Sequence, residues 1–371
     1  MKKYSQASDG SYQTIIWDGT YTKDGKKRYK HLRSYASSRD LETMVEKYKR
    51  ELEDLGAPLS DPNAILYDFA KSWLKTFKSQ REKSTIEMYE RVIRILEQSP
   101  IGQIPVCKLE KKDLQELMNE NCGHPRTCKK IMLTYKQLVK YGISNHILRA
   151  SSIFDLCDGI SYPQYRSKER RPLTDVEISA LRASGSSFTL REAAFIQILL
   201  GCGLRREEAI ALTRFDIDLK KNYIRVNKAV GFYHGRPYDK ATKNYKERSV
   251  PMPPKTAAAL AAYIPTAHDA YLFTDSRHKQ LTAGTYRTLW SNIVRKIYAN
   301  IPGGIDTGLT AHIFRHNYCT RLCYQIPAIS IKKIAELMGD TEAMVMGVYS
   351  HIMDEKEDIS GALDRFAAET M

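Results

Sequence analysis

The chain has 371 residues, enough for two or three domains that each bury a hydrophobic core. Its 58 Lys and Arg outnumber its 43 Asp and Glu, and the formal net charge of +15 favours polyanionic partners, nucleic acid above all. Apolar runs fall short of the roughly 18 residues that span a bilayer, and the N-terminus lacks the apolar stretch of a signal peptide. These features argue against a membrane or secreted protein, and we expect a cytoplasmic one.

Seven cysteines are scattered through the sequence, and their odd number indicates reduced thiols rather than a disulfide framework. Cys122, His124 and Cys128 are close enough in sequence to raise a zinc site as an alternative. A second pair of residues with ligand spacing does not accompany them, so we expect no metal.

Up to residue 57, we expect a small three-stranded sheet followed by one helix. Residues 12–17 are rich in β-formers, Asp24 and Gly25 form a hairpin signal, and residues 28–33 alternate after it. Ser38 is placed to cap a helix over residues 41–55.

Basic side chains gather on the predicted strands of this region, interleaved with Tyr21, Tyr29 and Tyr35. A strand face of this kind suits a DNA groove, and the alternative is a solvated, charged hairpin. The candidate DNA contacts are Lys23, Lys26, Lys27, Arg28, Lys30 and Arg33.

Residues 60–165 are expected to form a compact helical bundle. Apolar residues recur at helix spacing over residues 66–77, and Ser84 with Glu87 has the pattern of a capping box. Two more helices are expected at 110–120 and 125–141. The surface is basic, and a polar, basic linker follows at residues 161–171. The candidate DNA contacts in the bundle and linker are Lys83, Arg166, Lys168 and Arg170.

The third region begins near residue 170. Thr174 and Glu177 form a capping box, and the very apolar helix over 193–200 is expected to be buried. Residues 223–226 and 247–251 are expected to pair in a small antiparallel sheet, and helices dominate afterwards. The fold class is therefore α+β and multidomain, with a mainly helical third domain.

Several short motifs follow one another in this third region. The apolar helix leads into Gly203, Leu204 and Arg205, with Glu208 three residues later, and Thr242 and Lys243 lie in the loop before the last strand. His312 and Arg315 share one face if their segment is helical. The set ends with Leu337, Gly339, Asp340 and Tyr349.

This ordered set resembles the catalytic domain of the tyrosine recombinases, phage-type and conjugative-element integrases among them. Any one motif is weak, but the ordered set with the family's spacing is specific. The resemblance is strong over residues 172–360 and implies a catalytic domain with a C-terminal tail helix at 170–371. The bundle at 60–165 is similar to the family's core-binding domain, and residues 1–57 look like the arm-type DNA-binding domain of some integrases.

The resemblance implies roles for the phosphate-binding residues. Arg205 and Arg315 would grip the scissile phosphate, since the planar guanidinium binds two oxygens and stays charged. Glu208 would buttress Arg205 or His312. His312 would hydrogen-bond the phosphate or help to move the tyrosine's proton. Lys243 would protonate the departing 5′-oxygen, with Lys240 and Lys246 as rivals in the same loop.

Tyr349 would be the nucleophile and would form a 3′-phosphotyrosyl intermediate. Tyr318 and Tyr324 are the rival tyrosines in this domain. The covalent link conserves the bond energy, so no ATP is needed. The arginines replace the charge of a metal, so no cofactor of any kind is expected.

Asp340 departs from the family pattern, which has His or Trp directly after the glycine. An ionised carboxylate would repel the phosphate. Three alternatives follow: Asp340 turns away, it orients a neighbour such as His351, or the enzyme is slower. We expect Asp340→His to retain or raise cleavage.

The implied function is site-specific recombination for integration and excision of a mobile element. The partners implied are double-stranded DNA and a homo-tetramer on synapsed DNA, to which the tail around Ile359, Leu363 and Phe366 contributes; accessory DNA-bending or excision factors would join them. The competing functions are a type IB topoisomerase with the same chemistry on one duplex, a DNA-binding regulator without catalysis, and a basic protein of membrane surfaces.

Overall fold

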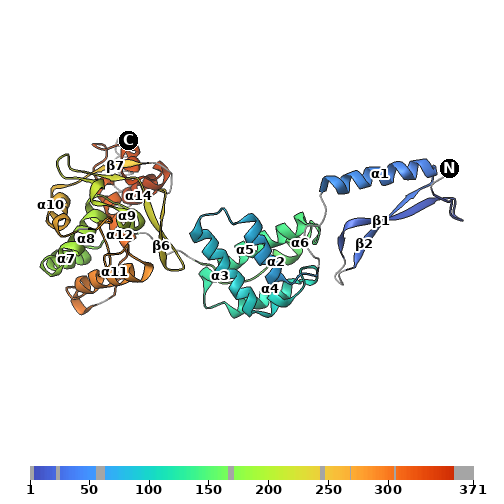
Figure 1. The fold of residues 1–371 in the computed structure, drawn as a ribbon, viewed down its shortest axis with the longest axis horizontal. Coiled ribbons are helices and arrows are strands. Elements are labelled where there is room, and N and C mark those ends of the chain that lie inside the picture. Colours follow the sequence, from blue (N-terminus) through green and yellow to red (C-terminus); the bar gives the residue numbers. More distant parts are fainter. Residues whose placement is uncertain are drawn as a thin grey trace, which may run out of the picture. The chain divides into compact units, whose positions relative to one another are not determined.

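This computed structural model describes residues 4–21, 26–55, 63–165, 171–242, 247–267, 269–304 and 306–354. The chain divides into two compact units, residues 1–167 and 168–371 (Figure 1). Helices dominate both units, with small antiparallel sheets, as the sequence predicts. No helix in the described ranges is long and apolar enough to cross a membrane.

The N-terminal region is a β-hairpin with a helix along one face (Figure 1). Strands β1 (Tyr12–Tyr21) and β2 (Lys27–Ser34) pair antiparallel, and α1 (Ser38–Leu55) covers them. A small core forms between the two layers from Tyr12, Leu32, Leu41 and Val45.

The expected third strand of this sheet is wrong for the described residues, where the sheet has two strands and one isolated bridge from Gln6 to Tyr12. Asp9 accepts hydrogen bonds from the backbone and the hydroxyl of Ser11 (3.0 and 2.6 Å), and Gly10 has φ +80°. This tight turn folds the described segment back on the start of β1, which it meets only at the Gln6–Tyr12 bridge.

The predicted N-cap of α1 is shifted by one residue. The Ser37 hydroxyl accepts the backbone N–H of Asp40 at 3.0 Å, whereas the Ser38 hydroxyl accepts the N–H of Tyr4 at 3.1 Å. Ser38 therefore ties the N-terminal segment to the helix instead of capping it.

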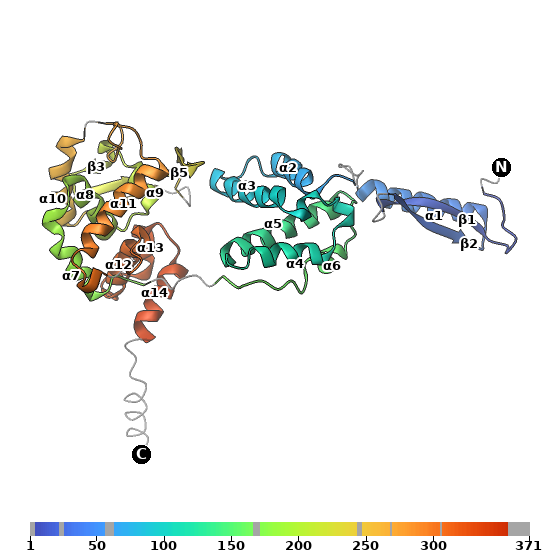
Figure 2. The ribbon, with the colours of Figure 1, turned by 90° about the horizontal axis from the view of Figure 1, so that it is seen from below.

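The second region is the expected helical bundle (Figure 2). Its core holds the predicted apolar faces, with Phe69, Trp73, Tyr89 and Leu96 all buried. Its helices are α2 (Leu66–Phe77), α3 (Lys83–Gln98), α4 (Lys111–Glu120), α5 (Pro125–Ser144) and α6 (Ser152–Cys157). The short α6 has too few residues to show a helical period in the sequence.

The predicted capping box at the start of α3 is wrong. Glu82 is the N-cap, and its carboxylate accepts the backbone N–H of Ser84 at 3.0 Å. Glu87 instead pairs with Arg91 one turn later, at 2.7 Å. A carboxylate directly before the helix competes successfully with a serine for the free N–H groups of the first turn.

The second unit surrounds the buried helix α8 (Leu190–Gly201), as expected from its apolar sequence. A three-stranded antiparallel sheet has the order β3 (Ile217–Asp218), β4 (Tyr223–Val226) and β7 (Arg248–Pro251), which confirms the two predicted strands. A separate hairpin, β5 (Ala229–Tyr233) and β6 (Arg236–Lys240), lies between β4 and β7 in the chain. The other helices are α7 (Asp175–Ala183), α9 (Arg206–Ala211), α10 (Pro254–Tyr263) and α11 (Ala283–Tyr298).

The last three helices form a subcore of their own (Figure 2). Helices α12 (Ala311–Cys323), α13 (Ile331–Met338) and α14 (Glu342–Asp354) contact one another. Buried side chains of all three, including Cys319, Ile334 and Val345, fill the space between them. This subcore fixes α14, the helix that carries Tyr349.

A buried ion pair anchors the start of the second unit. Arg171 donates two hydrogen bonds to Glu177 (2.6 and 2.7 Å) and one to the carbonyl oxygen of Thr307 (3.1 Å). Glu177 also accepts the N–H of Thr174, which confirms the predicted capping box. Burial favours protonation of Glu177, but the hydrogen bonds from Arg171 and Thr307 outweigh it and lower the pKa to about 2.

We expect Glu177→Gln to destabilise the protein at pH 7 by an amount on the order of 3 kcal/mol, because the unfolded carboxyl has a pKa of about 4.3. A lowered folded pKa stabilises the protein above the unfolded pKa, and this contribution is lost as the pH falls from about 4.3 towards 2. The gap between the calorimetric melts of the two proteins should therefore narrow by about half from pH 7 to pH 3. The exposed Glu336→Gln serves as control, and a gap that stays constant with pH would contradict this account.

Candidate active site

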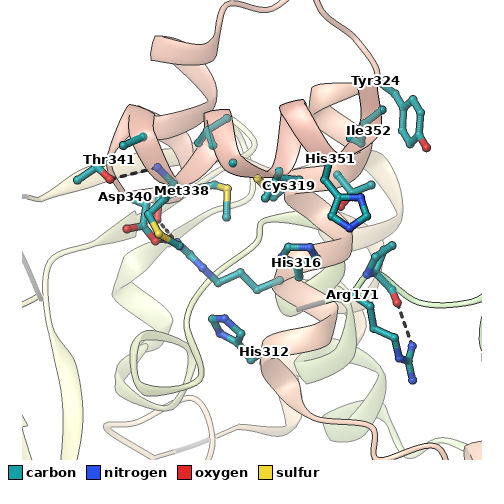
Figure 3. A pocket seen from close by; sticks show the side chains of 18 of the residues that line it. Arg171, His312, His316, Cys319, Tyr324, Met338, Asp340, Thr341, His351 and Ile352 are labelled. Carbon is teal, nitrogen blue, oxygen red and sulfur yellow. Dashed lines mark hydrogen bonds and ion pairs between the residues drawn. The ribbon is translucent and has the colours of Figure 1, made fainter. Parts of the chain in front are cut away.

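A single pocket of about 820 Å³ in the second unit brings together four of the predicted site residues (Figure 3). Arg205, His312, Arg315 and Asp340 all line it. They come from α9, α12 and the turn after α13, which are distant in sequence and meet only through the packing of the unit.

The turn between α8 and α9 positions the side chain of Arg205. Gly203 has φ +61°, and a Cβ atom there would lie 2.1 Å from the ring of Tyr318, so only glycine fits. Arg205 is the N-cap of α9, and its backbone N–H and Nη1 both donate to Glu208 at 2.9 Å. Glu208 thus fixes both the start of the helix and the direction of the guanidinium.

Arg248, the first residue of β7, is part of this arrangement and was missed by the sequence analysis. It donates from Nη1 and Nη2 to Glu208, at 3.0 and 2.7 Å. Arg248 lies two residues before the buried Val250, so both side chains are on the inward face of the strand. A charged residue on an inward face was the sequence signal that could have identified Arg248. Burial favours protonation of Glu208, but the hydrogen bonds and charges of Arg248 and Arg205 lower its pKa.

The C-terminal end of α13 orients all three arginines. Three consecutive carbonyl oxygens each accept a hydrogen bond from a different guanidinium, where the partial negative charge of the helix end also favours cations. The pairs are Leu337 with Arg248 (3.0 Å), Met338 with Arg315 (2.7 Å) and Gly339 with Arg205 (2.8 Å). Gly339 has φ +60°, and a Cβ atom there would lie 2.6 Å from Nη1 of Arg248.

Asp340 points into this cluster and does not turn away from it. Its Oδ2 accepts from Nη2 of Arg205 at 3.0 Å and from Nη2 of Arg315 at 3.2 Å. Arg315 is almost fully buried, and burial lowers its pKa to about 10, so it stays charged at neutral pH. Three guanidiniums and the two carboxylates of Glu208 and Asp340 leave a net positive charge.

Three histidines line the same pocket (Figure 3). His312 and Arg315 lie on α12, as the sequence predicts, and His316 follows His312 by one helical turn. His351 reaches the pocket from α14. The spacing of His312 and His316 would have been enough to add His316 to the candidates.

Tyr349 does not line this pocket in the described part of the chain. Its neighbours Val348 and His351 on α14 do, whereas Tyr349 packs, partly buried, against the subcore of α12 and α13. Residues two positions apart in a helix are about 200° apart around its axis, so Tyr349 and His351 lie on nearly opposite sides of α14. The structure thus brings the arginines together but not the tyrosine.

The two rival tyrosines differ in their surroundings. Tyr318 is buried against Gly203, and burial raises its pKa to about 12. Tyr324 is 47% exposed and lines the pocket.

The candidate general acid, Lys243, lies outside the described residues, as does its rival Lys246. Thr242, directly before it, is buried, and Lys240 ends β6 in a half-buried position.

The candidate DNA contacts of the N-terminal hairpin separate onto two faces. Lys30 lies over the ring of Tyr48 on α1, 4.2 Å from its centroid, so Lys30 and Arg28 share the face towards the helix. Lys27 and Arg33 lie on the open face, together with exposed Tyr29. Lys26 and Lys83 are exposed, at the starts of β2 and α3. The remaining candidates, Lys23, Arg166, Lys168 and Arg170, lie outside the described residues.

Metal ligands do not cluster in the described ranges, where no group of three His, Cys, Asp or Glu is arranged to hold an ion. Cys122 is exposed, whereas the thiol of Cys128 is buried and lies 3.1 Å from the carbonyl oxygen of Asn121.

Residues 173–356 match a model of the phage integrase family. A tyrosine recombinase XerC from Chlamydia caviae is 25% identical over 288 residues, which cover 75% of this chain and 86% of the relative. A tyrosine recombinase from Thermosipho africanus is 24% identical over 291 residues, which cover 75% of this chain and 92% of the relative.

Solved structures share the fold. The Tn1549 transposon integrase in complex with a circular intermediate DNA superposes with a TM-score of 0.67 at 21% identity, covering 82% of this chain and 99% of that one. A lambda integrase tetramer bound to a Holliday junction gives a TM-score of 0.57 at 17% identity, covering 91% of this chain and 95% of that one.

We expect Arg248→Met to lower the free energy of unfolding by about 3–5 kcal/mol, because it removes two donors from a buried carboxylate. Arg225→Met on the neighbouring strand β4 is the matched control, since its pair with Glu247 is exposed and contributes at most about 1 kcal/mol. Urea denaturation measures both. The double variant Arg248→Met/Glu208→Gln should recover part of the loss; equal losses in the two single variants would refute the buried clamp.

Proposed function

We propose that this chain, whose residues 173–356 match a model of the phage integrase family, is a tyrosine-type site-specific recombinase that cuts and rejoins double-stranded DNA. The observation that carries this proposal is the convergence of two guanidiniums on one anionic oxygen. Arg205 and Arg315 both donate from Nη2 to Oδ2 of Asp340. A non-bridging oxygen of a phosphodiester is the natural substrate counterpart of that carboxylate oxygen.

In the proposed reaction the hydroxyl oxygen of Tyr349 attacks the scissile phosphorus. A phosphotyrosyl ester forms at the 3′ end, and the bond to the 5′-oxygen breaks. Arg205 and Arg315 offset the negative charge that builds up on the phosphate oxygens in the transition state. Lys243 supplies the proton that the departing 5′-oxygen takes up, and His312 hydrogen-bonds the phosphate or moves the tyrosine's proton.

Rejoining is the reverse step on another strand. A 5′-hydroxyl attacks the phosphotyrosyl ester and releases Tyr349, so the number of phosphodiester bonds is unchanged and neither ATP nor a metal ion is required. Since Tyr349 packs away from the pocket here, α14 must reposition before cleavage.

We assign residues 1–57 to an arm-type DNA-binding domain, residues 60–165 to a core-binding domain and residues 170–371 to the catalytic domain. Integration and excision of a mobile element in the cytoplasm is the use that this organisation suits. A homo-tetramer on two synapsed duplexes is the working assembly, in line with the lambda integrase tetramer that shares the fold. The tail beyond residue 354, outside the described residues, contributes to that assembly.

A nicked suicide duplex that carries the end of the element tests the nucleophile. We expect the wild type to give a covalent protein–DNA band on a denaturing gel, and Tyr349→Phe to give none, because phenylalanine has no attacking oxygen. Tyr324→Phe and Tyr318→Phe are the matched controls and should keep the band. A band that persists in Tyr349→Phe would identify another nucleophile, and its absence in every protein despite DNA binding would favour a non-catalytic regulator.

The two faces of the N-terminal hairpin test the arm assignment. Lys27→Ala/Arg33→Ala should weaken binding to a duplex by about tenfold and reduce the salt slope by about 2, since two phosphate contacts are lost. Arg28→Ala/Lys30→Ala removes the same charge from the face towards α1 and should have a smaller effect. Fluorescence anisotropy at several salt concentrations measures both, and equal losses would contradict binding through the open face.

A further inference from the structure

The position of Asp340 has a consequence beyond the reaction itself. We propose that its carboxylate is an internal stand-in for the scissile phosphate, and that DNA must displace it, thereby releasing α14 with Tyr349. The inference rests on the proposed function for the identity of the competing anion. The contacts of the two arginines carry the argument.

Four N–H groups of the two arginines donate to groups other than Asp340. Nη1 of Arg205 donates to Glu208, and Nη1 of Arg315 donates to the carbonyl oxygen of Gly203. Each Nη2 donates once to a carbonyl oxygen at the end of α13 and once to Asp340. A phosphate oxygen at the point where the two guanidiniums converge would compete for the N–H groups that now donate to Asp340.

Phosphate and carboxylate cannot share these donors comfortably. Both are anions, and two negative charges within about 4 Å of each other repel strongly in a site that is mostly shielded from water. The Asp340 side chain is 19% exposed and that of Arg315 is 3% exposed, so screening by solvent is weak. Arrival of the phosphate therefore expels the carboxylate.

In the absence of DNA the carboxylate has a stabilising role. Arg205, Arg248 and Arg315 lie close together, and Glu208 alone would leave two positive charges unbalanced. Asp340 offsets one of them and occupies the point where Arg205 and Arg315 converge. The same contact that stabilises the empty site competes with its substrate.

Asp340 also lies two residues before α14, the helix that carries the proposed nucleophile Tyr349. Thr341 separates it from α14, which begins at Glu342. The carbonyl oxygen of Gly339 accepts a hydrogen bond from Arg205, and the backbone N–H of Asp340 donates to the carbonyl oxygen of Ala335. These two backbone contacts do not involve the Asp340 side chain. The side chain of Asp340 is thus the arginine contact nearest to the start of α14. In the proposal, its release frees the turn that leads into α14 and allows the helix to shift on its subcore.

Inorganic phosphate is the probe for the first half of the proposal. We expect Asp340→Asn and Asp340→Ala to bind phosphate about tenfold more tightly than the wild type in a ³¹P NMR titration of the full chain without DNA. Glu336→Gln removes the same charge from an exposed position on α13 and should stay within twofold of the wild type. Unchanged or weaker binding in both Asp340 variants, with wild-type circular dichroism, would overturn the proposal.

Hydrogen exchange over residues 341–354 is the probe for the second half. Phosphate should raise exchange there in the wild type, and both Asp340 variants should show raised exchange without phosphate. Glu336→Gln should behave as the wild type does. Exchange that neither phosphate nor the substitutions alter would show that α14 is held independently of Asp340, and would refute the release.

The suicide duplex separates this inference from the proposed function. Asp340→Ala and Asp340→His should form the covalent complex at least as fast as the wild type. Cleavage by the wild type with a large loss in both variants would leave the recombinase assignment intact and refute the stand-in. Absence of a covalent complex in every protein, with tighter phosphate binding in the variants, would refute the assignment and leave the carboxylate as the competing anion.

Discussion

The site depends on one electrostatic constraint, which is that three guanidiniums must lie side by side in a place that water scarcely reaches. Like charges gather there only if oxygen atoms surround them. Six oxygen-bearing groups among the described residues do so: the carbonyl of Gly203, three carbonyls at the end of α13, and the carboxylates of Glu208 and Asp340. The left-handed Gly339, which lies close to Arg248, and the burial of Arg315 both accompany this arrangement.

This arrangement joins stability to chemistry. Glu208 lies between Arg205, which faces the pocket, and Arg248, which does not line it. One end of the network holds the sheet to the helices, and the other end presents positive charge to a ligand. A side chain far from the reacting atoms therefore sets the direction of one that would touch them.

The sequence was most informative where structure is local. The Thr174 capping box, the buried α8, the strands β4 and β7 and the pairing of His312 with Arg315 on one helix depend on residues a few positions apart. The predictions from sequence failed where another residue competes for the same backbone groups, or where two residues in contact lie far apart in the chain. Glu82 displaced the expected cap, and Arg248 meets Glu208 across a separation of 40 residues. The packing of the partly buried Tyr349 against the subcore likewise has no signature in its neighbouring residues.

The use of backbone oxygens at the end of α13 bears on how such a protein diverges. A carbonyl group is the same in every amino acid, so the positions of Leu337 and Met338 supply their hydrogen bonds whichever side chain they carry. Only Gly339 is restricted, by its left-handed backbone and its distance from Arg248. At the positions of Leu337 and Met338 the contribution to the arginine cluster therefore depends on backbone geometry and not on residue identity. This chain and the Tn1549 transposon integrase share only about a fifth of their residues and yet have the same fold.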